Sequence, residues 1–207
     1  AARGRCRPST RHRSGSAGLL ARPVVLADLG CGTGYFASAL AGLCARLVCV
    51  DASNAMLDEA KKKLEPMPPG TELDLRRGEL TDLPLADREL DGCVAGMVLH
   101  HLEEPLAALR EMRRVLKPGA SAVVVELMPH RETWMQAELG DRHLGLDPRD
   151  VLRAFQRAGF EGARLEPVED RYQPKHRAPQ AAAPDSASEP AALPMFLVRA
   201  RTPAAHA

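Results

Sequence analysis

The residues best suited to chemistry gather first between positions 28 and 51. Asp28 begins the segment DLGCGTG, in which Gly30, Gly32 and Gly34 stand at every second position. Glycines spaced in this way permit a tight turn and let a ligand approach the backbone closely. Asp51 ends the next apolar run, where a carboxylate can accept hydrogen bonds from both hydroxyls of a ribose. Together these residues indicate a site for a nucleoside-containing ligand.

The charge of Asp28 narrows the class of ligand. A carboxylate at the mouth of the loop would repel a pyrophosphate, whereas it would stabilise a ligand that carries positive charge. The GxGxG spacing also differs from the GxGxxG spacing of dinucleotide-binding loops. We therefore expect a cationic ligand, and the competing hypothesis of a nicotinamide dinucleotide is disfavoured.

Alternating strands and helices must position these residues. Residues 24–29 form an apolar run typical of a buried parallel strand, and the segment after Gly34 can start a helix. Ser53, Pro105 and Pro148 mark the starts of further helices. The pattern predicts a doubly wound α/β sheet. Its other strands are expected at residues 46–50, 73–77, 90–99, 121–127, 163–168 and 195–198.

Composition limits the organisation of the chain to one folded domain. The chain has 207 residues, 45% of them hydrophobic, and no apolar run approaches the roughly 20 residues that span a bilayer. Residues 1–22 hold six arginines and no acid, so we expect a disordered basic tail. The domain is expected at residues 23–172 and 193–201, with a low-complexity linker at residues 173–192.

Charge and cysteine content exclude several function classes. Without its basic tail the chain is net acidic, and only 3% of all residues are aromatic, so we do not expect the folded part to bind nucleic acid. The five cysteines are odd in number and form no CxxC pair. That usage is typical of reduced thiols in a cytoplasmic protein, and it does not favour a zinc site.

With these segments in place, the chain resembles the class I S-adenosylmethionine-dependent methyltransferases over roughly residues 22–200. The resemblance rests on DLGCGTGYF, VDAS, GELTDLP and MVLHHLEEPLAALREMRRVLKPGA, in the family's order and spacing. Within this class the chain looks like the ubiquinone and menaquinone methyltransferases. Through VVVELMPHRETWMQAELGDRHLGL it looks closer still to bacterial methyltransferase domains fused to arsenic-repressor-type regulators. The resemblance implies a Rossmann-like, mostly parallel, seven-stranded sheet whose last strand is antiparallel.

The resemblance also implies S-adenosylmethionine as the cofactor. Its sulfonium and ammonium groups suit the carboxylate of Asp28, while Asp51 would bind the ribose and Glu79 the adenine amine. The full set of expected cofactor contacts is Asp28, Gly30, Cys31, Gly32, Gly34, Asp51, Ala52, Met56, Glu79, Leu80 and Met97.

His100 and His101 are candidate catalytic residues, because a histidine can take a proton from an acceptor near neutral pH. The alternative is that both side chains only satisfy a turn at the entrance of the next helix. We expect no metal there, since adjacent histidines point in different directions and no third ligand is near in sequence. The resemblance places the acceptor side at Glu126, His130, Trp134, Asp141 and His143.

The implied reaction is methyl transfer to a small-molecule acceptor by in-line displacement. Arsenite methylation is disfavoured, because most of the cysteines fall in expected buried strands. The alternative function is a module that senses S-adenosylmethionine or S-adenosylhomocysteine and partners with a winged-helix transcriptional regulator. Residues 1–18 also lack the apolar stripe of the lid helix usual in this family, so we expect weakened cofactor binding.

Overall fold

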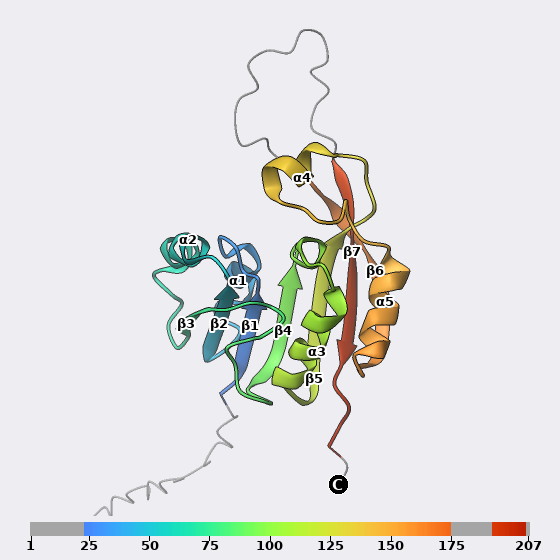
Figure 1. Ribbon diagram of the computed structural model, residues 1–207. Coiled ribbons are helices and arrows are strands. Elements are labelled where there is room, and N and C mark those ends of the chain that lie inside the picture. Colours follow the sequence, from blue (N-terminus) through green and yellow to red (C-terminus); the bar gives the residue numbers. More distant parts are fainter. Residues whose placement is uncertain (1–22, 175–191, 206–207) are drawn as a thin grey trace, which may run out of the picture.

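A seven-stranded sheet organises the protein (Figure 1). The computed structural model describes residues 23–174 and 192–205. The parallel strands are β1 (Val25–Leu29), β2 (Arg46–Asp51), β3 (Glu72–Arg77), β4 (Leu90–Gly96) and β5 (Leu116–Leu127). β7 (Leu193–Arg201) runs antiparallel between β5 and the edge strand β6 (Glu161–Tyr172). The order is β3-β2-β1-β4-β5-β7-β6, which confirms the expected sheet and its antiparallel last strand.

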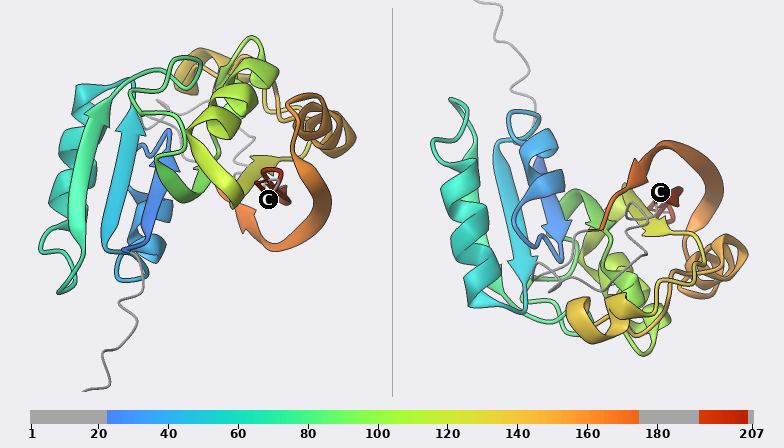
Figure 2. Two further views of the ribbon diagram at one scale, coloured as in Figure 1. Left: turned by 90° about the horizontal axis from the view of Figure 1, so that it is seen from below. Right: turned by 90° about the horizontal axis from the view of Figure 1, so that it is seen from above.

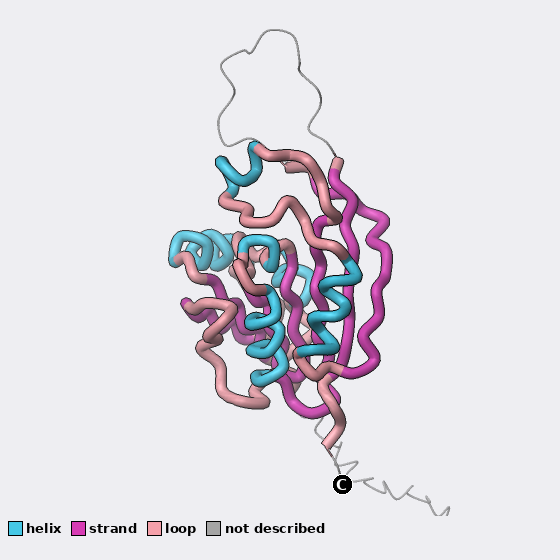
Figure 3. The backbone as a smooth tube through the Cα atoms, turned by 45° about the vertical axis from the view of Figure 1, so that its right-hand side comes forward, coloured by secondary structure: helices cyan, strands magenta, loops and turns pink. Residues whose placement is uncertain are grey.

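Helices cover both faces of the sheet, as expected of a doubly wound fold (Figure 2). On one face lie α1 (Tyr35–Leu40) and α2 (Asn54–Leu64), and on the other lie α3 (Pro105–Val115) and α5 (Pro148–Arg157). The short α4 (Trp134–Leu139) lies beyond the ends of the strands (Figure 3). A ligand at that end of the sheet would therefore lie close to α4.

Strand β2 shows how the sequence pattern builds two cores. Leu47 and Cys49 pack with residues of α1 and α2, whereas Val48 and Val50 pack in the larger cluster that contains α3 and α5. All four side chains are fully buried. A parallel strand covered on both faces must be apolar throughout, and this explains its unbroken apolar run.

The expected helix starts are confirmed. The hydroxyl of Ser53 accepts the backbone N–H of Met56 at 3.4 Å and caps α2. Pro105 and Pro148 stand in the first turns of α3 and α5, and the carboxylate of Asp147 caps α5. Each of these residues satisfies the end of a helix or lacks an N–H there, so local chemistry alone sets these boundaries.

Four strands differ from the prediction by more than one residue. β5 begins at Leu116 and not at residue 121, and β7 covers residues 193–201 and not 195–198, because both strands pair beyond their apolar runs. β4 ends at Gly96 and not at residue 99, because Met97 takes a left-handed φ of 58° and Leu99–His101 form a 3₁₀ turn, η1. β6 covers residues 161–172 and not 163–168, since it pairs along β7 as far as Tyr172, which lies opposite Leu193. β6 is an edge strand with many exposed residues, so it lacks the apolar run that marks a central strand.

The expected basic tail at residues 1–22 lies outside the described residues. Residues 175–191, which make up most of the expected linker, also lie outside them. Among the helices of the described residues, none combines the length and apolar character needed to cross a bilayer.

The packing of α5 can be tested at Phe155, which is fully buried with its ring centroid 5.1 Å from that of Phe160. We expect Phe155→Ala to lower the free energy of unfolding by about 3–5 kcal/mol, because it removes a buried ring and leaves a cavity. Urea denaturation measures the change. As the control, Leu43→Ala should cost less than about 0.5 kcal/mol, since Leu43 is 68% exposed. Equal losses for the two variants would contradict this packing.

Candidate functional site

The carboxyl ends of the five parallel strands meet at one edge of the sheet, where the expected site residues lie. Asp28 stands near the end of β1 and Asp51 is the last residue of β2. Glu79 follows β3, and Met97 follows β4 directly. Because the strands are parallel and in register, the fold brings these four residues to the same edge.

The loop between β1 and α1 is a tight backbone cradle. Gly30, Gly32 and Gly34 all have left-handed φ values, of 72°, 49° and 79°, which only glycine adopts at little cost. A Cβ on Gly30 would lie 2.4 Å from the side chain of Val98, whereas a Cβ on Gly32 would meet no atom within 4 Å. The backbone at Gly32 therefore borders open space, as a ligand-binding loop requires.

Asp28 is a buried acid with one oxygen left over. Its side chain is 1% exposed, and Oδ2 accepts the backbone N–H of Ala37 at 2.7 Å. Oδ1 is also buried but has no hydrogen-bond partner in the described structure. Burial raises the pKa of Asp28 from 3.8 to about 7, while the bond from Ala37 opposes the shift. A cationic or donating ligand group would satisfy Oδ1, so the residue fits the ammonium or sulfonium of S-adenosylmethionine.

Asp51 ties the cradle to the end of β2. Its Oδ2 accepts the N–H of Gly32 at 2.8 Å, and its Oδ1 accepts the N–H of Ser53 at 2.9 Å. Each carboxylate oxygen has a second lone pair, so both can still accept from a ribose. Each oxygen of the carboxylate thus accepts one backbone hydrogen bond and keeps one lone pair for a ligand.

The other expected cofactor contacts differ in exposure. Ala52 and Glu79 are exposed, Met56 is half-buried in the first turn of α2, and Leu80 is buried. Cys31 is 6% exposed, and its side chain packs in the core beside α1 and α2. These residues flank the cradle without closing it.

Glu126 holds the turn after β4. It is fully buried, and its Oε1 accepts the backbone N–H groups of Val98, Leu99 and His100 at 3.0, 2.7 and 3.3 Å. Its Oε2 lies 2.7 Å from Nδ1 of His100 and accepts the N–H of Leu127. We expected Glu126 on the acceptor side, but the structure places it beneath the turn, where it positions His100.

A cavity of about 190 Å³ opens beside this turn. Its polar lining residues are His100, His101 and Asp141, and its apolar ones include Met97. The remaining walls come from α4 and the end of β6: Met135, Leu139 and Tyr172. The cavity therefore extends from Met97, directly after β4, to His100 and His101.

Like Glu126, three further residues expected on the acceptor side do not line this cavity. Nδ1 of His130 accepts the N–H of Glu132 at 3.2 Å, and burial lowers the pKa of His130. Trp134 donates from Nε1 to Glu132 at 2.9 Å and packs with the cluster under α4. His143 lies with Nε2 2.9 Å from the carbonyl oxygen of Leu102. These contacts shape the segment that carries Asp141.

Tyr172, like Met135 and Leu139, is a cavity residue that the sequence did not reveal. It is the last residue of β6 and packs with Met97 and Trp134 in the cluster around Leu127. An aromatic residue at the end of a polar edge strand was the one available signal. That signal is weak, because single aromatic residues on a surface strand usually pack without function.

The sequence of this chain is similar to those of known methyltransferases. Residues 27–124 match the family described as "Methyltransferase domain". A bifunctional biotin biosynthesis protein of Teredinibacter turnerae is 30% identical over 149 residues, which are 66% of this chain and 26% of that protein. The 2-phytyl-1,4-naphtoquinone methyltransferase of Synechococcus elongatus is 33% identical over 103 residues, 48% of this chain and 44% of that enzyme. The chain thus spans less than half the length of these relatives.

A solved structure shares the whole architecture. The S-adenosylmethionine-dependent methyltransferase of Mesorhizobium loti superposes with a TM-score of 0.62 at 23% identity, covering 86% of this chain and 91% of that one. At this identity the likeness shows the fold alone. A structure from Aquifex aeolicus with the same fold, at 19% identity and a TM-score of 0.60, is likewise described as a SAM-dependent methyltransferase. The chain has the class I methyltransferase fold, and residues 27–124 match the methyltransferase-domain family.

Proposed function

We propose that this chain transfers the methyl group of S-adenosylmethionine to a small-molecule acceptor. The observation that carries the proposal is Asp28, a buried carboxylate at the glycine cradle whose Oδ1 has no partner among the described residues. A buried acid in this state is costly to the fold unless a ligand supplies the missing donor. Bound S-adenosylmethionine would bring that donor together with a methyl group already activated on a sulfonium.

Different residues in and beside the cradle would contact different parts of the cofactor. Asp28 would face its methionine end, and the spare lone pairs of Asp51 would accept from the ribose. The open space at Gly32 leaves room for the cofactor to pass along the backbone. Glu79 is exposed after β3 and is free to reach the adenine amine. Little further chemistry is asked of the protein beyond alignment of the acceptor with the methyl carbon.

The acceptor would bind in the cavity between Met97 and Tyr172. A volume of about 190 Å³ is below the 300–1,000 Å³ of most ligand pockets, so the acceptor, or its reacting part, is small. His100 and His101 are the groups on this wall that can receive the acceptor's proton or hold its deprotonated atom. We also place the protein in the cytoplasm, because its four described cysteines are free and buried.

A turnover assay separates this enzyme from a sensor that partners with a winged-helix regulator. We expect release of S-adenosylhomocysteine above background when the protein is supplied with a panel of small oxygen, nitrogen and sulfur acceptors. The acceptor cavity motivates this expectation, since a sensor has no need of one. Cofactor binding without turnover on any acceptor, together with an effect on a regulator's DNA affinity, would favour the sensor.

Two matched glycine variants test the cofactor site. Gly32 and Gly70 both have left-handed φ values, of 49° and 86°, and a Cβ on either would meet no atom within 4 Å. Alanine should therefore strain both positions similarly, by about 1–2 kcal/mol. By calorimetry we expect Gly32→Ala to weaken S-adenosylmethionine binding at least about tenfold, because the methyl group enters the cradle. Gly70→Ala should bind as the wild type does, and equal affinities for all three proteins would refute the site.

The same titration tests whether cofactor binding is weak because residues 1–18 lack the apolar stripe of a lid helix. Residues 1–18 have no apolar stripe to cover the cofactor, so we expect the wild-type affinity to be weaker than the low micromolar range. Binding at or beyond about 8 kcal/mol would show that the cofactor is held without a lid.

The pKa of Asp28 predicts how stability depends on pH. Its folded value is about 7 against 3.8 in the unfolded chain, so the folded state binds the extra proton between these values. Stability from this group therefore falls as pH rises from about 4 to 7, by up to about 4 kcal/mol. Asp28→Asn should lack this fall in urea denaturation series across that range. Asp58→Asn, on the exposed side of α2, should follow the wild type.

A further inference from the structure

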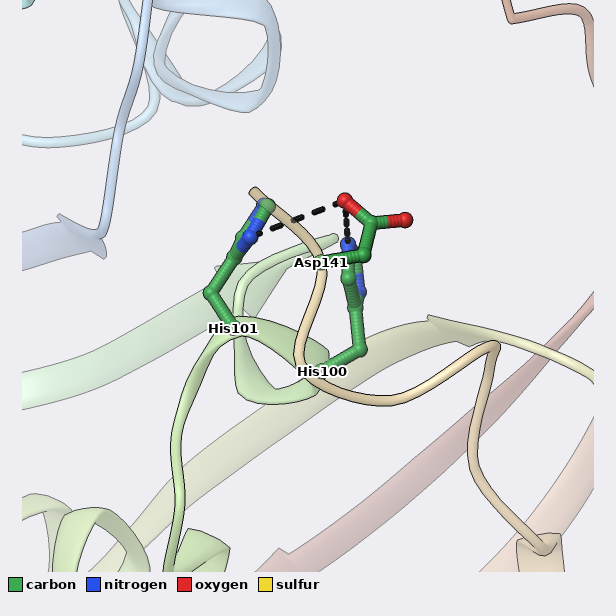
Figure 4. Close-up of side chains that lie close together, drawn as sticks. All are labelled: His100, His101 and Asp141. Atoms are coloured by element: carbon green, nitrogen blue, oxygen red, sulfur yellow. Dashed lines mark ion pairs between the residues drawn. The ribbon is translucent and has the colours of Figure 1, made fainter. Parts of the chain in front are cut away.

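Two segments far apart in the chain bring three metal-ligand side chains together in the cavity (Figure 4). His100 and His101 come from η1, and Asp141 comes from the loop after α4. Oδ1 of Asp141 lies 3.7 Å from Nε2 of His100 and 3.7 Å from Nδ1 of His101. One ligand atom of each residue lies within 4.8 Å of the others.

Asp141 is the group that most needs an explanation. Its residue is 4% exposed, and neither carboxylate oxygen has a hydrogen-bond partner in the described structure. The imidazole nitrogens at 3.7 Å are too distant for hydrogen bonds. Backbone bonds from Arg142 and His143 to the carbonyl of His100 fix this loop against the turn, so the carboxylate is held in place. A buried carboxylate without donors is stabilised by a bound cation, which would satisfy its oxygens.

Glu126 orients His100 as a ligand. Nδ1 of His100 lies 2.7 Å from Oε2 of the fully buried Glu126, so Nδ1 carries the proton that makes this bond. The lone pair of Nε2 then points toward Asp141. A carboxylate that fixes the far nitrogen of a histidine is the usual arrangement behind a metal-bound imidazole, because it sets the tautomer and the ring direction.

We propose that His100, His101 and Asp141 form a binding site for a divalent transition metal of the zinc type. Two imidazoles and one carboxylate favour zinc or a neighbouring transition metal over magnesium or calcium, which prefer oxygen ligands alone. Three protein ligands leave a fourth position open, as in catalytic metal sites. Nδ1 of His101 also lies 3.3 Å from the carbonyl oxygen of Gly140, a contact that a bound metal would replace. Met97 and Tyr172 border the space into which the open position would face.

A metal with an open position would favour an acceptor that reacts through oxygen or sulfur. This inference rests on the proposed methyl transfer. An oxygen or sulfur acceptor that binds the open position would lose its proton to solvent and remain as an alkoxide, phenolate or thiolate on the metal. The reacting atom would then lie next to Met97, on the cofactor side of the cavity. The metal would therefore replace a histidine base as the means of activating the acceptor.

A proton is the rival to a metal at this position. Burial alone would lower the pKa of His100, but the hydrogen bond to Glu126 and the charge of Asp141 outweigh it and raise the pKa. A doubly protonated His100 would pair with both Glu126 and Asp141. Protonation of His100 would not explain why Nδ1 of His101 also lies near Oδ1 of Asp141.

Metal binding to the full chain without S-adenosylmethionine tests the site directly. We expect dialysed protein to retain close to one Zn²⁺ per chain by mass spectrometry, and Co²⁺ to give absorption bands of nitrogen and oxygen ligation. Asp141→Asn and His101→Gln should each weaken Zn²⁺ binding at least about 100-fold, because each removes a direct ligand. Asp58→Asn is the matched control for Asp141→Asn and should bind as the wild type does, since Asp58 is exposed on α2 and lies outside the cluster.

Glu126→Gln adds a test of the positioning residue. We expect it to weaken Zn²⁺ binding about 10–100-fold while circular dichroism shows a folded chain. A wild-type protein that retains neither metal, thiolate bands with Co²⁺, or unchanged affinity in both Asp141→Asn and His101→Gln would overturn the metal site. These outcomes are independent of cofactor binding, which the Gly32→Ala titration measures separately.

Discussion

One buried carboxylate holds the active end of this fold together. Glu126 stands near the end of β5, yet it accepts three consecutive backbone N–H groups from the turn that follows β4. It also bonds the ring of His100 and the N–H of Leu127. A charge without solvent is tolerable only with donors of this number and quality. The position of Met97 and both histidines follows from this anchor, because each lies in or beside the turn that it fixes.

The buried acids at this end of the sheet fall into two kinds. Glu126 has donors at both oxygens, whereas Asp28 has one oxygen without a partner and Asp141 has two. Native proteins rarely leave buried polar atoms unpaired, so incomplete satisfaction separates ligand-facing acids from structural ones. By this criterion we propose that Asp28 faces the cofactor and that Asp141 faces the acceptor.

Local chemistry made much of the structure predictable from the sequence. The Gly30–Gly34 cradle, the Ser53 cap and the proline starts of α3 and α5 depend on residues only a few positions apart. Such signals survive in any fold that contains them. The same reasoning predicted a strand through residue 99, where Glu126 in fact imposes a turn. That contact comes from a distant strand, so no local pattern contains it.

The acceptor side could not be predicted as well, for a related reason. A metal at His100 and His101 was disfavoured for want of a third ligand nearby in sequence, yet the fold brings Asp141 to them from another segment. Tyr172 likewise reaches the cavity only because β6 pairs along β7 to its end. Sequence spacing limits which ligands can be neighbours on one element, but tertiary contacts decide which elements meet.

Tyr172 and Leu193 lie opposite each other where β6 ends and β7 begins. These two residues are hydrogen-bonded strand neighbours, so the chain between them begins and ends at almost one point. Both anchor residues also belong to the cluster of side chains beneath α4. Because Leu193 is buried opposite Tyr172, the register between β6 and β7 fixes where this wall of the cavity stands, although Leu193 itself does not line the cavity.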